Sequence, residues 1–172
     1  LYFTYKFKFE IMKRIILTSS FLFLCFSIFA AVWRLNNIGA NASISGTLQD
    51  AINYSSPGDT IHVEPSSTSY GSASITKNIT LIGAGYWLTE NDSTQANTMT
   101  SLVGSLTFSQ GSEGSKICGL YIEGRINIQT DNITISRNYI NQSTSSTSEA
   151  IYINGSNQNI KIIQNFLQTK PK

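Results

Sequence analysis

Charged side chains that could carry acid–base chemistry gather in one stretch of the chain. Acid–base catalysis needs carboxylates and basic groups held together in one site. Four such residues fall within a single repeat of the sequence and could meet on an outer face. They are Glu123, Arg125, Asp131 and Arg137. A salt-bridged surface is the competing interpretation, and exposed pairs of that kind contribute only about 0–1 kcal/mol.

The other ionisable residues form no recognisable catalytic or metal-binding pattern. No two aspartates are adjacent or share a position in the repeat described below, and the single histidine, His62, lies on an expected strand as a structural residue. Glu90 to Ser93 lacks the alternating ligands of a calcium loop. The sequence therefore predicts no catalytic residue, no metal site and no cofactor in this chain.

Three tyrosines offer a different chemistry, the stacking of aromatic rings on sugar rings. They are Tyr121, Tyr139 and Tyr152, and packing within the fold is the alternative role for each. Charge does not select a ligand, because only 13% of the residues are charged and the net charge is +2. No basic patch is interleaved with aromatic residues, so nucleic acid is not expected as a partner.

A repeated six-residue pattern predicts the elements that would position these residues. Each copy has an aliphatic residue first, a turn-compatible residue near the middle, and an aromatic and an aliphatic residue at its end. The copies are 117–122, 135–140 and 162–167, and a second series of β-rich runs lies at 106–108, 126–128 and 151–153. A period of roughly 20–25 residues predicts a parallel β-helix. Two strands are expected per turn.

Matching residues of successive rungs should stack in this fold. The predicted inward ladders are Ile117/Ile135/Ile162 and Ile122/Ile140/Leu167, and the predicted aromatic row is Tyr121/Tyr139/Phe166. Asparagines 78, 132 and 159 share one register and are expected at corners, because asparagine tolerates left-handed backbone. The same reasoning applies to Asn138 and Asn165, with Leu120 in the equivalent place of the earlier rung.

A short helix is predicted before the first recognised strand. Thr47 is a suitable N-cap, and Asp50 stands where a capping box requires an acceptor. Pro57 and Gly58 end the helix, and Thr60 begins a strand that continues to Val63. A helix in this place would cap the open end of a β-solenoid.

The run Thr47-Leu-Gln-Asp-Ala-Ile52 followed by Ser56-Pro-Gly-Asp-Thr-Ile61 resembles the opening of right-handed parallel β-helix proteins of the pectin-lyase-like superfamily. The later Asn-Ile-Thr-Ile and Asn-Tyr-Ile runs resemble the coils of that family, so the resemblance covers nearly all of residues 47–167. It implies an all-β, right-handed parallel β-helix with a short N-terminal capping α-helix. It does not assign an activity, because a fold alone does not license function.

The same resemblance implies what an active member would contain. Lyases of the superfamily pair calcium-binding carboxylates with a base, and hydrolases use two or three aspartates. The Asn-Thr-Asp, Asp-Asp and Gly-His-Gly runs of the hydrolases and the arginine-proline signature of the lyases are absent from this sequence. Calcium is therefore expected only if the chain belongs to a lyase.

The N-terminus has the pattern of an export signal. Residues 1–11 precede the first methionine and are interpreted as upstream sequence outside the product. Residues 12–31 have a basic start, an uncharged apolar stretch and small residues at the end, which predicts a signal peptide. A membrane anchor is the alternative, but the apolar stretch is shorter than the roughly 20 residues of a bilayer span. We therefore expect a secreted or cell-surface protein without a stable transmembrane span.

The predicted organisation is a cap and first strand at residues 32–63 and β-helix coils at residues 64–172, with further coils expected beyond Lys172. The leading functional hypothesis is a non-catalytic module that scaffolds or binds extended glycans. Two alternatives stay open: the N-terminal part of a polysaccharide lyase or glycoside hydrolase whose catalytic coils lie beyond residue 172, and a structural spacer or adhesin. Polysaccharide is the expected partner.

Overall fold

The structure is a computed structural model that describes residues 2–24, 30–38, 42–90, 98–142 and 149–169. Three parts of the sequence-based predictions lie outside these residues. They are residues 25–29 of the expected signal peptide, residues 91–93 of the segment that begins at Glu90, and residues 170–172.

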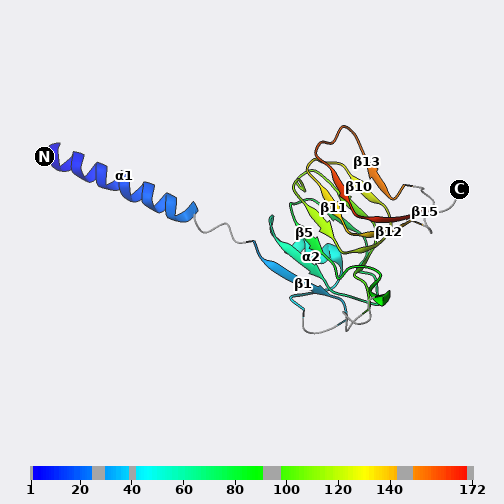
Figure 1. Ribbon diagram of the computed structural model, residues 1–172. Coiled ribbons are helices and arrows are strands. Elements are labelled where there is room, and N and C mark those ends of the chain that lie inside the picture. The colour runs from blue at the N-terminus through cyan, green and yellow to red at the C-terminus, as the bar shows by residue number, and fades with distance from the viewer. Residues whose placement is uncertain (1, 25–29, 39–41, 91–97, 143–148, 170–172) are drawn as a thin grey trace.

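The N-terminal helix α1 (Tyr2–Leu24) runs across the expected boundary between residues 11 and 12. Figure 1 shows that α1 extends away from the β-structure that forms the rest of the protein. No helix among the described residues combines the length and the apolar character needed to cross a membrane.

Three parallel sheets, here called A, B and C, form the rest of the fold (Figure 1). Sheet A contains β1 (Val32–Asn36), β2 (Ile44–Ser45), β3 (Thr60–Val63), β5 (Thr80–Ile82), β8 (Lys116–Cys118), β11 (Thr134–Ser136) and β14 (Lys161–Ile163). Sheet B contains β4 (Ala73–Ile75), β7 (Leu106–Phe108), β10 (Ile126–Ile128) and β13 (Ile151–Ile153). Sheet C contains β6 (Leu102–Val103), β9 (Tyr121–Glu123), β12 (Tyr139–Gln142) and β15 (Phe166–Thr169). Apart from α1, the helical elements are α2 (Leu48–Tyr54) and the short 3₁₀ turn η1 (Leu88–Glu90).

From β4 onward the chain visits sheets B, A and C in turn, so each of these coils adds one strand to every sheet, whereas β1, β2 and β3 all belong to sheet A. Strands β7, β8 and β9 form one coil, β10, β11 and β12 the next, and β13, β14 and β15 the last. The predicted two strands per turn were therefore wrong. The six-residue pattern hid a strand boundary, because Ile117 lies on β8 and Ile122 lies on β9 with a corner between them. The fold is a parallel, all-β solenoid-like arrangement.

The predicted ladders are confirmed by the strand register. Ile117, Ile135 and Ile162 pair in sheet A, and Ile122, Ile140 and Leu167 pair in sheet C. The first two members of each ladder are completely buried. Since successive side chains of a strand point to opposite faces, these aliphatic residues fill the interior while their neighbours point outward. Burial of such side chains contributes about 1.5–3 kcal/mol each.

Left-handed residues make the corners, as expected, but the residue types differ from the prediction. Asn132 (φ 59°) and Asn159 (φ 55°) are left-handed as predicted, whereas Asn78, expected to share their register, is not left-handed. At the corner between sheets A and C, however, the left-handed residues are Arg137 and Gln164, with Gly119 in the equivalent place. The predicted left-handed conformation of Asn138 and Asn165 was therefore wrong, because their side chains bond to neighbouring coils instead.

Asn138 and Asn165 form a ladder of side-chain hydrogen bonds between coils. Asn138 is fully buried, and its Oδ1 accepts from the N–H of Leu120 at 3.1 Å. Asn165 Oδ1 in turn accepts from the backbone N–H of Asn138 at 2.9 Å and from its Nδ2 at 3.1 Å. The ladder satisfies corner groups that would otherwise be buried without partners.

Helix α2 begins with the predicted capping box. The side chain of Thr47 accepts from the N–H of Asp50, whose carboxylate accepts from the N–H of Thr47. The hydroxyl of Thr47 also donates to the Asp50 carboxylate at 2.6 Å, and this bond together with the one from the Thr47 N–H lowers the pKa of the Asp50 carboxyl. Gln49 reaches from α2 to β4, where its Oε1 accepts from the N–H of Ser74 at 2.8 Å. Since β4 is the last strand of sheet B, this amide occupies the edge that another strand would otherwise pair with.

The N-terminal part of the solenoid contains two strands that the sequence did not reveal. β1 and β2 precede α2, and β1 pairs with β3 from Val32↔Thr60 to Leu35↔Val63. The prediction that Thr60 begins the first strand was therefore wrong. Asp59, only 2% exposed, fixes β1 by accepting from the N–H of Ala31 and from Trp33 Nε1, both at 2.7 Å. No copy of the repeat marks this segment, so periodicity could not identify it.

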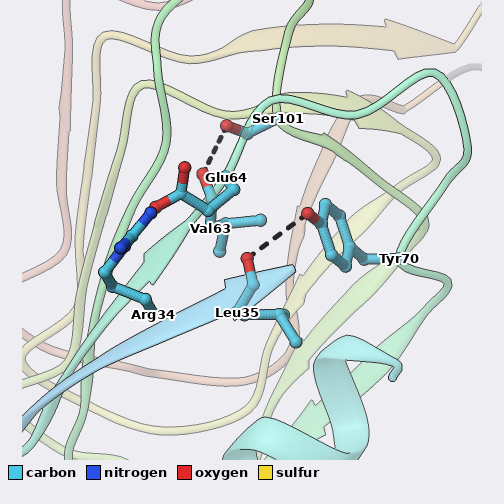
Figure 2. Close-up of polar contacts among 6 residues, drawn as sticks. All are labelled: Arg34, Leu35, Val63, Glu64, Tyr70 and Ser101. Atoms are coloured by element: carbon cyan, nitrogen blue, oxygen red, sulfur yellow. Dashed lines mark hydrogen bonds and ion pairs between the residues drawn. The ribbon is translucent and has the colours of Figure 1, made fainter. Parts of the chain in front are cut away.

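Buried polar contacts close a corner beside β1 and β3 (Figure 2). Tyr70 donates to the carbonyl of Leu35 at 3.3 Å, and burial raises the pKa of its hydroxyl. Ser101 donates to the carbonyl of Val63 at 2.6 Å. The exposed Arg34–Glu64 ion pair lies on the outer side of the same strands at 2.8 Å. These contacts connect β1 and the end of β3 to the segments that contain Tyr70 and Ser101.

Candidate functional site

Aromatic rings are stacked on the outer face of sheet C. Tyr121, Tyr139 and Phe166 pair in register on β9, β12 and β15, which confirms the predicted aromatic row. The ring centroids are 4.6 Å apart for Tyr121 and Tyr139, and 5.1 Å apart for Tyr139 and Phe166. The rings of the second pair are stacked and nearly parallel, with an interplanar angle of 5°. We call these three residues the aromatic column.

Two further rings from the segment after β5 extend the aromatic column sideways. The ring of Tyr86 lies 6.0 Å from that of Tyr139, and the ring of Trp87 lies 4.9 Å from that of Phe166. Tyr86 also donates to the carbonyl of Gln164 at 3.5 Å. The segment that contains Tyr86 and Trp87 comes earlier in the sequence than the three strands of the column, and it lies across their rings. The column with Tyr86 and Trp87 is called the aromatic face below.

Trp87 has an unusual backbone conformation for so large a residue. Its φ is 55°, and its side chain is 47% exposed. A left-handed conformation at a bulky residue costs about 1–3 kcal/mol and persists where surrounding contacts compensate for it. The contacts with Tyr86 and Phe166 supply such compensation. The sequence analysis gave Tyr86 and Trp87 no role, although two consecutive aromatic residues in a polar stretch were an available signal.

Polar groups border the rings of the aromatic column. The hydroxyl of Tyr139 donates to Gln168 Oε1, and Asn141 Nδ2 donates to the hydroxyl of Tyr121 at 3.1 Å. Burial raises the pKa of the Tyr139 hydroxyl, and the neighbouring Tyr121 raises it further. The Tyr139 hydroxyl is therefore a protonated hydrogen-bonding group at neutral pH. The face combines ring surfaces with amide side chains that both donate and accept.

Tyr152 lies apart from the other two predicted tyrosines. It belongs to β13 in sheet B, is 43% exposed, and has the guanidinium of Arg125 over its ring at 5.2 Å. Arg125 also pairs with Glu149 at 3.7 Å. The structure thus brings Tyr121 and Tyr139 together and leaves Tyr152 on a different sheet with its own cation.

The four charged candidates do not assemble into one site. Arg125 bonds Glu149, Asp131 accepts from the N–H of Gln158 at 2.7 Å, and Arg137 Nε donates to Gln164 Oε1 at 3.0 Å. Glu123 is an exposed residue of β9. Among the described residues, none of the four side chains bonds another of the four. Of the three contacts, only Arg125–Glu149 is an ion pair, so the salt-bridged surface of the competing interpretation is present at Arg125.

Potential metal ligands, the single histidine and the free cysteine are the other side chains that could carry chemistry. No group of three or more histidine, cysteine or acidic side chains that could hold a metal occurs among the described residues. His62 is exposed on β3. Cys118 is a free, partly exposed thiol whose pKa is raised by burial, although Arg137 acts in the opposite direction. A raised pKa reduces the reactive thiolate at neutral pH.

Comparisons with protein-family models, with curated proteins and with solved structures gave no match for the chain. A functional proposal therefore depends on the geometry of the aromatic face.

Proposed function

We propose that this chain is a non-catalytic, right-handed parallel β-helix module of an exported protein, and that it binds extended glycans along the outer face of sheet C. The three parallel sheets support the solenoid, and parallel strands joined by crossovers favour right-handed connections. The signal-peptide pattern of residues 12–31 supports a secreted or cell-surface location. The resemblance to the pectin-lyase-like superfamily supports polysaccharide as the partner.

The observation that carries this proposal is the aromatic face. Tyr139 and Phe166 stack on each other, so much of their ring surface is occupied within the column. Trp87 meets Phe166 at an interplanar angle of 63°, an edge contact, and is 47% exposed. It can therefore offer ring surface to the apolar face of a sugar. Trp87 is the expected centre of the site.

The amide groups beside the column provide the polar part of the recognition. Gln168 and Asn141 lie next to the tyrosine hydroxyls and can both donate to and accept from sugar hydroxyls. Sites of this kind combine aromatic surface with a few placed polar groups. Because the column runs across successive coils of sheet C, an extended chain of sugar rings fits it better than a single monosaccharide.

A binding series tests the proposal. The protein is titrated by calorimetry with neutral and acidic polysaccharide fragments. We expect saturable binding of at least one class, weakened by about tenfold or more in Trp87→Ala, as for an aromatic anchor. Tyr152→Ala is the matched control, because Tyr152 is similarly exposed on another sheet. Binding that is lost equally in both variants, or absent from the unmodified protein, would refute the proposal.

A parallel assay addresses catalysis. The protein is incubated with polygalacturonate and calcium, and ultraviolet absorbance is followed for unsaturated product. A non-catalytic module gives no turnover. Robust metal-dependent turnover would contradict that part of the proposal and favour a lyase.

A further inference from the structure

A buried carboxylate meets the segment at which the predicted signal peptide ends. Asp59 is 2% exposed, and its Oδ1 accepts from the backbone N–H of Ala31 at 2.7 Å. Its Oδ2 accepts from Trp33 Nε1 at 2.7 Å and from the N–H of Ser56 at 2.8 Å. All three donors are neutral groups. An aspartate that is almost completely buried normally has a cation as a partner.

The cationic side chains of the described residues do not fill that role. None of the ion pairs among those residues includes Asp59. Lys77 influences the carboxyl by its charge, but its Nζ donates to the carbonyl of Ser55 at 2.7 Å. The group in direct contact with Asp59 Oδ1 is the backbone nitrogen of Ala31.

Ala31 belongs to the folded part of the chain. Its N–H donates to Asp59, and its carbonyl accepts from the N–H of Thr60 at 2.9 Å. Ala31 is half-buried, whereas Ala30 is exposed. The sequence places the end of the signal peptide at these two alanines, with Ala31 as its last residue. A cut after Ala31 would remove both hydrogen bonds, one of them from a buried carboxylate, whereas a cut before it keeps both.

We propose that the Ala30–Ala31 peptide bond is the processing site of the exported precursor, and that the new N-terminus at Ala31 forms an ion pair with Asp59. This inference rests on the signal peptide of the proposed function, and it moves the end of that peptide from Ala31 to Ala30. Hydrolysis by a signal peptidase consumes one water and breaks the C–N bond. Ala30 leaves as a carboxylate, and the nitrogen of Ala31 takes up protons to become an ammonium group.

The cut changes the charge of a group that is already in place. The nitrogen that lies 2.7 Å from Asp59 Oδ1 as a neutral amide becomes a cation in the same position. Charge-assisted hydrogen bonds are roughly twice as strong as neutral ones. The other N–H groups of the ammonium can bond to water, because Ala31 is only half-buried. The first residues of a domain are poorly ordered unless they are tied down, and this ion pair ties the start of β1 to the residue before β3.

The N-terminal sequence and intact mass of the exported protein test the cleavage position. The chain is expressed from Met12, with its own signal, in a bacterial host, and the protein outside the cytoplasm is collected. We expect one species that begins at Ala31. A product that begins at Val32 or at any other residue would overturn the inference and leave export intact. A chain that stays uncleaved in the cytoplasm would overturn the inference together with the export part of the proposed function.

A second experiment tests the ion pair on the folded full-length protein. An enteropeptidase recognition sequence is inserted directly before Ala31, so that one cut makes Ala31 the N-terminus. Urea unfolding is measured before and after the cut. We expect the cut to lower the equilibrium constant of unfolding by about tenfold or more, as for a hydrogen bond between charged groups. An unchanged or larger constant would overturn the inference.

Two controls separate the charge from the removal of the preceding chain. In Asp59→Asn the same cut should have little effect, because the ammonium no longer meets a carboxylate. With the recognition sequence moved to directly before Ala30, the ammonium lies one residue away from Asp59, and the effect should again be small. Equal stabilisation in all three proteins would overturn the ion pair. Far-UV circular dichroism checks the fold, and the cut before Ala30 gives the comparison even if Asp59→Asn does not fold.

Discussion

Replacement of Asn138 by leucine tests whether the asparagine ladder holds the coils together. Leucine is an informative choice, because Leu120 occupies the equivalent place one coil earlier and is also fully buried. Asn138→Leu leaves the buried N–H of Leu120 without the Oδ1 acceptor that now lies 3.1 Å away. It also removes the Nδ2 bonds to the carbonyls of Ile117 and Ser136 and to Asn165.

The magnitude follows from these losses. An orphaned buried N–H costs about 1–3 kcal/mol, and each lost neutral hydrogen bond about 0.5–1.5 kcal/mol. Burial of the leucine side chain offsets about 1.5–3 kcal/mol of the total. We expect the free energy of unfolding to fall by about 2–4 kcal/mol, which lowers the melting temperature by roughly 5–15 °C in a domain of this size.

Urea unfolding followed by far-UV circular dichroism measures this change. Asn165→Leu is the control, because Asn165 is only half-buried and groups freed there can bond to water. It should cost about 1 kcal/mol. A loss below about 0.5 kcal/mol in Asn138→Leu, or a larger loss in Asn165→Leu, would refute the reasoning that the buried ladder holds the coils in register.

Three further substitutions test other parts of the structure by the same measurement. Burial alone would raise the pKa of the Asp59 carboxyl, but hydrogen bonds from Trp33 and from backbone N–H groups lower it overall. The stability that Asp59 contributes is therefore present above the ordinary carboxyl pKa of about 3.9 and is lost as the pH falls below it. Asp59→Asn should remove this loss of stability in acid, and an unchanged dependence of stability on pH would contradict the reasoning. Gln142 is buried, and neither atom of its side-chain amide has a hydrogen-bond partner among the described residues. Gln142→Met should therefore stabilise the fold by about 1 kcal/mol. Destabilisation in this variant would argue against an unsatisfied amide. Arg137→Gly should stabilise by about 0.5–1 kcal/mol, since glycine fits its φ of 54° as Gly119 fits the earlier corner, and a loss would mean that the exposed bond to Gln164 outweighs the backbone gain.

The repeat was sufficient to predict the stacking of coils because stacking depends on like residues in register. Ile117, Ile135 and Ile162 recur for that reason, and they pair as predicted. The capping box was readable because Thr47 and Asp50 are close in sequence and bond locally. The third strand per coil was not readable, since the corner at Gly119 lies inside the pattern and produces no break in its hydrophobicity.

The candidate site was only partly predictable. The pairing of Tyr121 with Tyr139 follows from register, so the aromatic column could be predicted from the repeat. The place of Trp87 depends on how a non-repeating segment lies across later coils, a long-range contact that periodicity does not encode. The charged residues did not assemble, because Arg125, Asp131 and Arg137 each contact a residue of the next coil, as Arg137 does with Gln164.

The most direct test of glycan binding at the aromatic face is the fluorescence of Trp87 itself. The chain has two tryptophans, so Trp33→Phe leaves Trp87 as the only one. This variant, with its fold checked by circular dichroism, is titrated with neutral and acidic glycan fragments. Burial of the exposed Trp87 ring against a sugar predicts a saturable blue shift of its emission. Emission that stays unchanged with every fragment while the fold is intact would contradict glycan binding at this face.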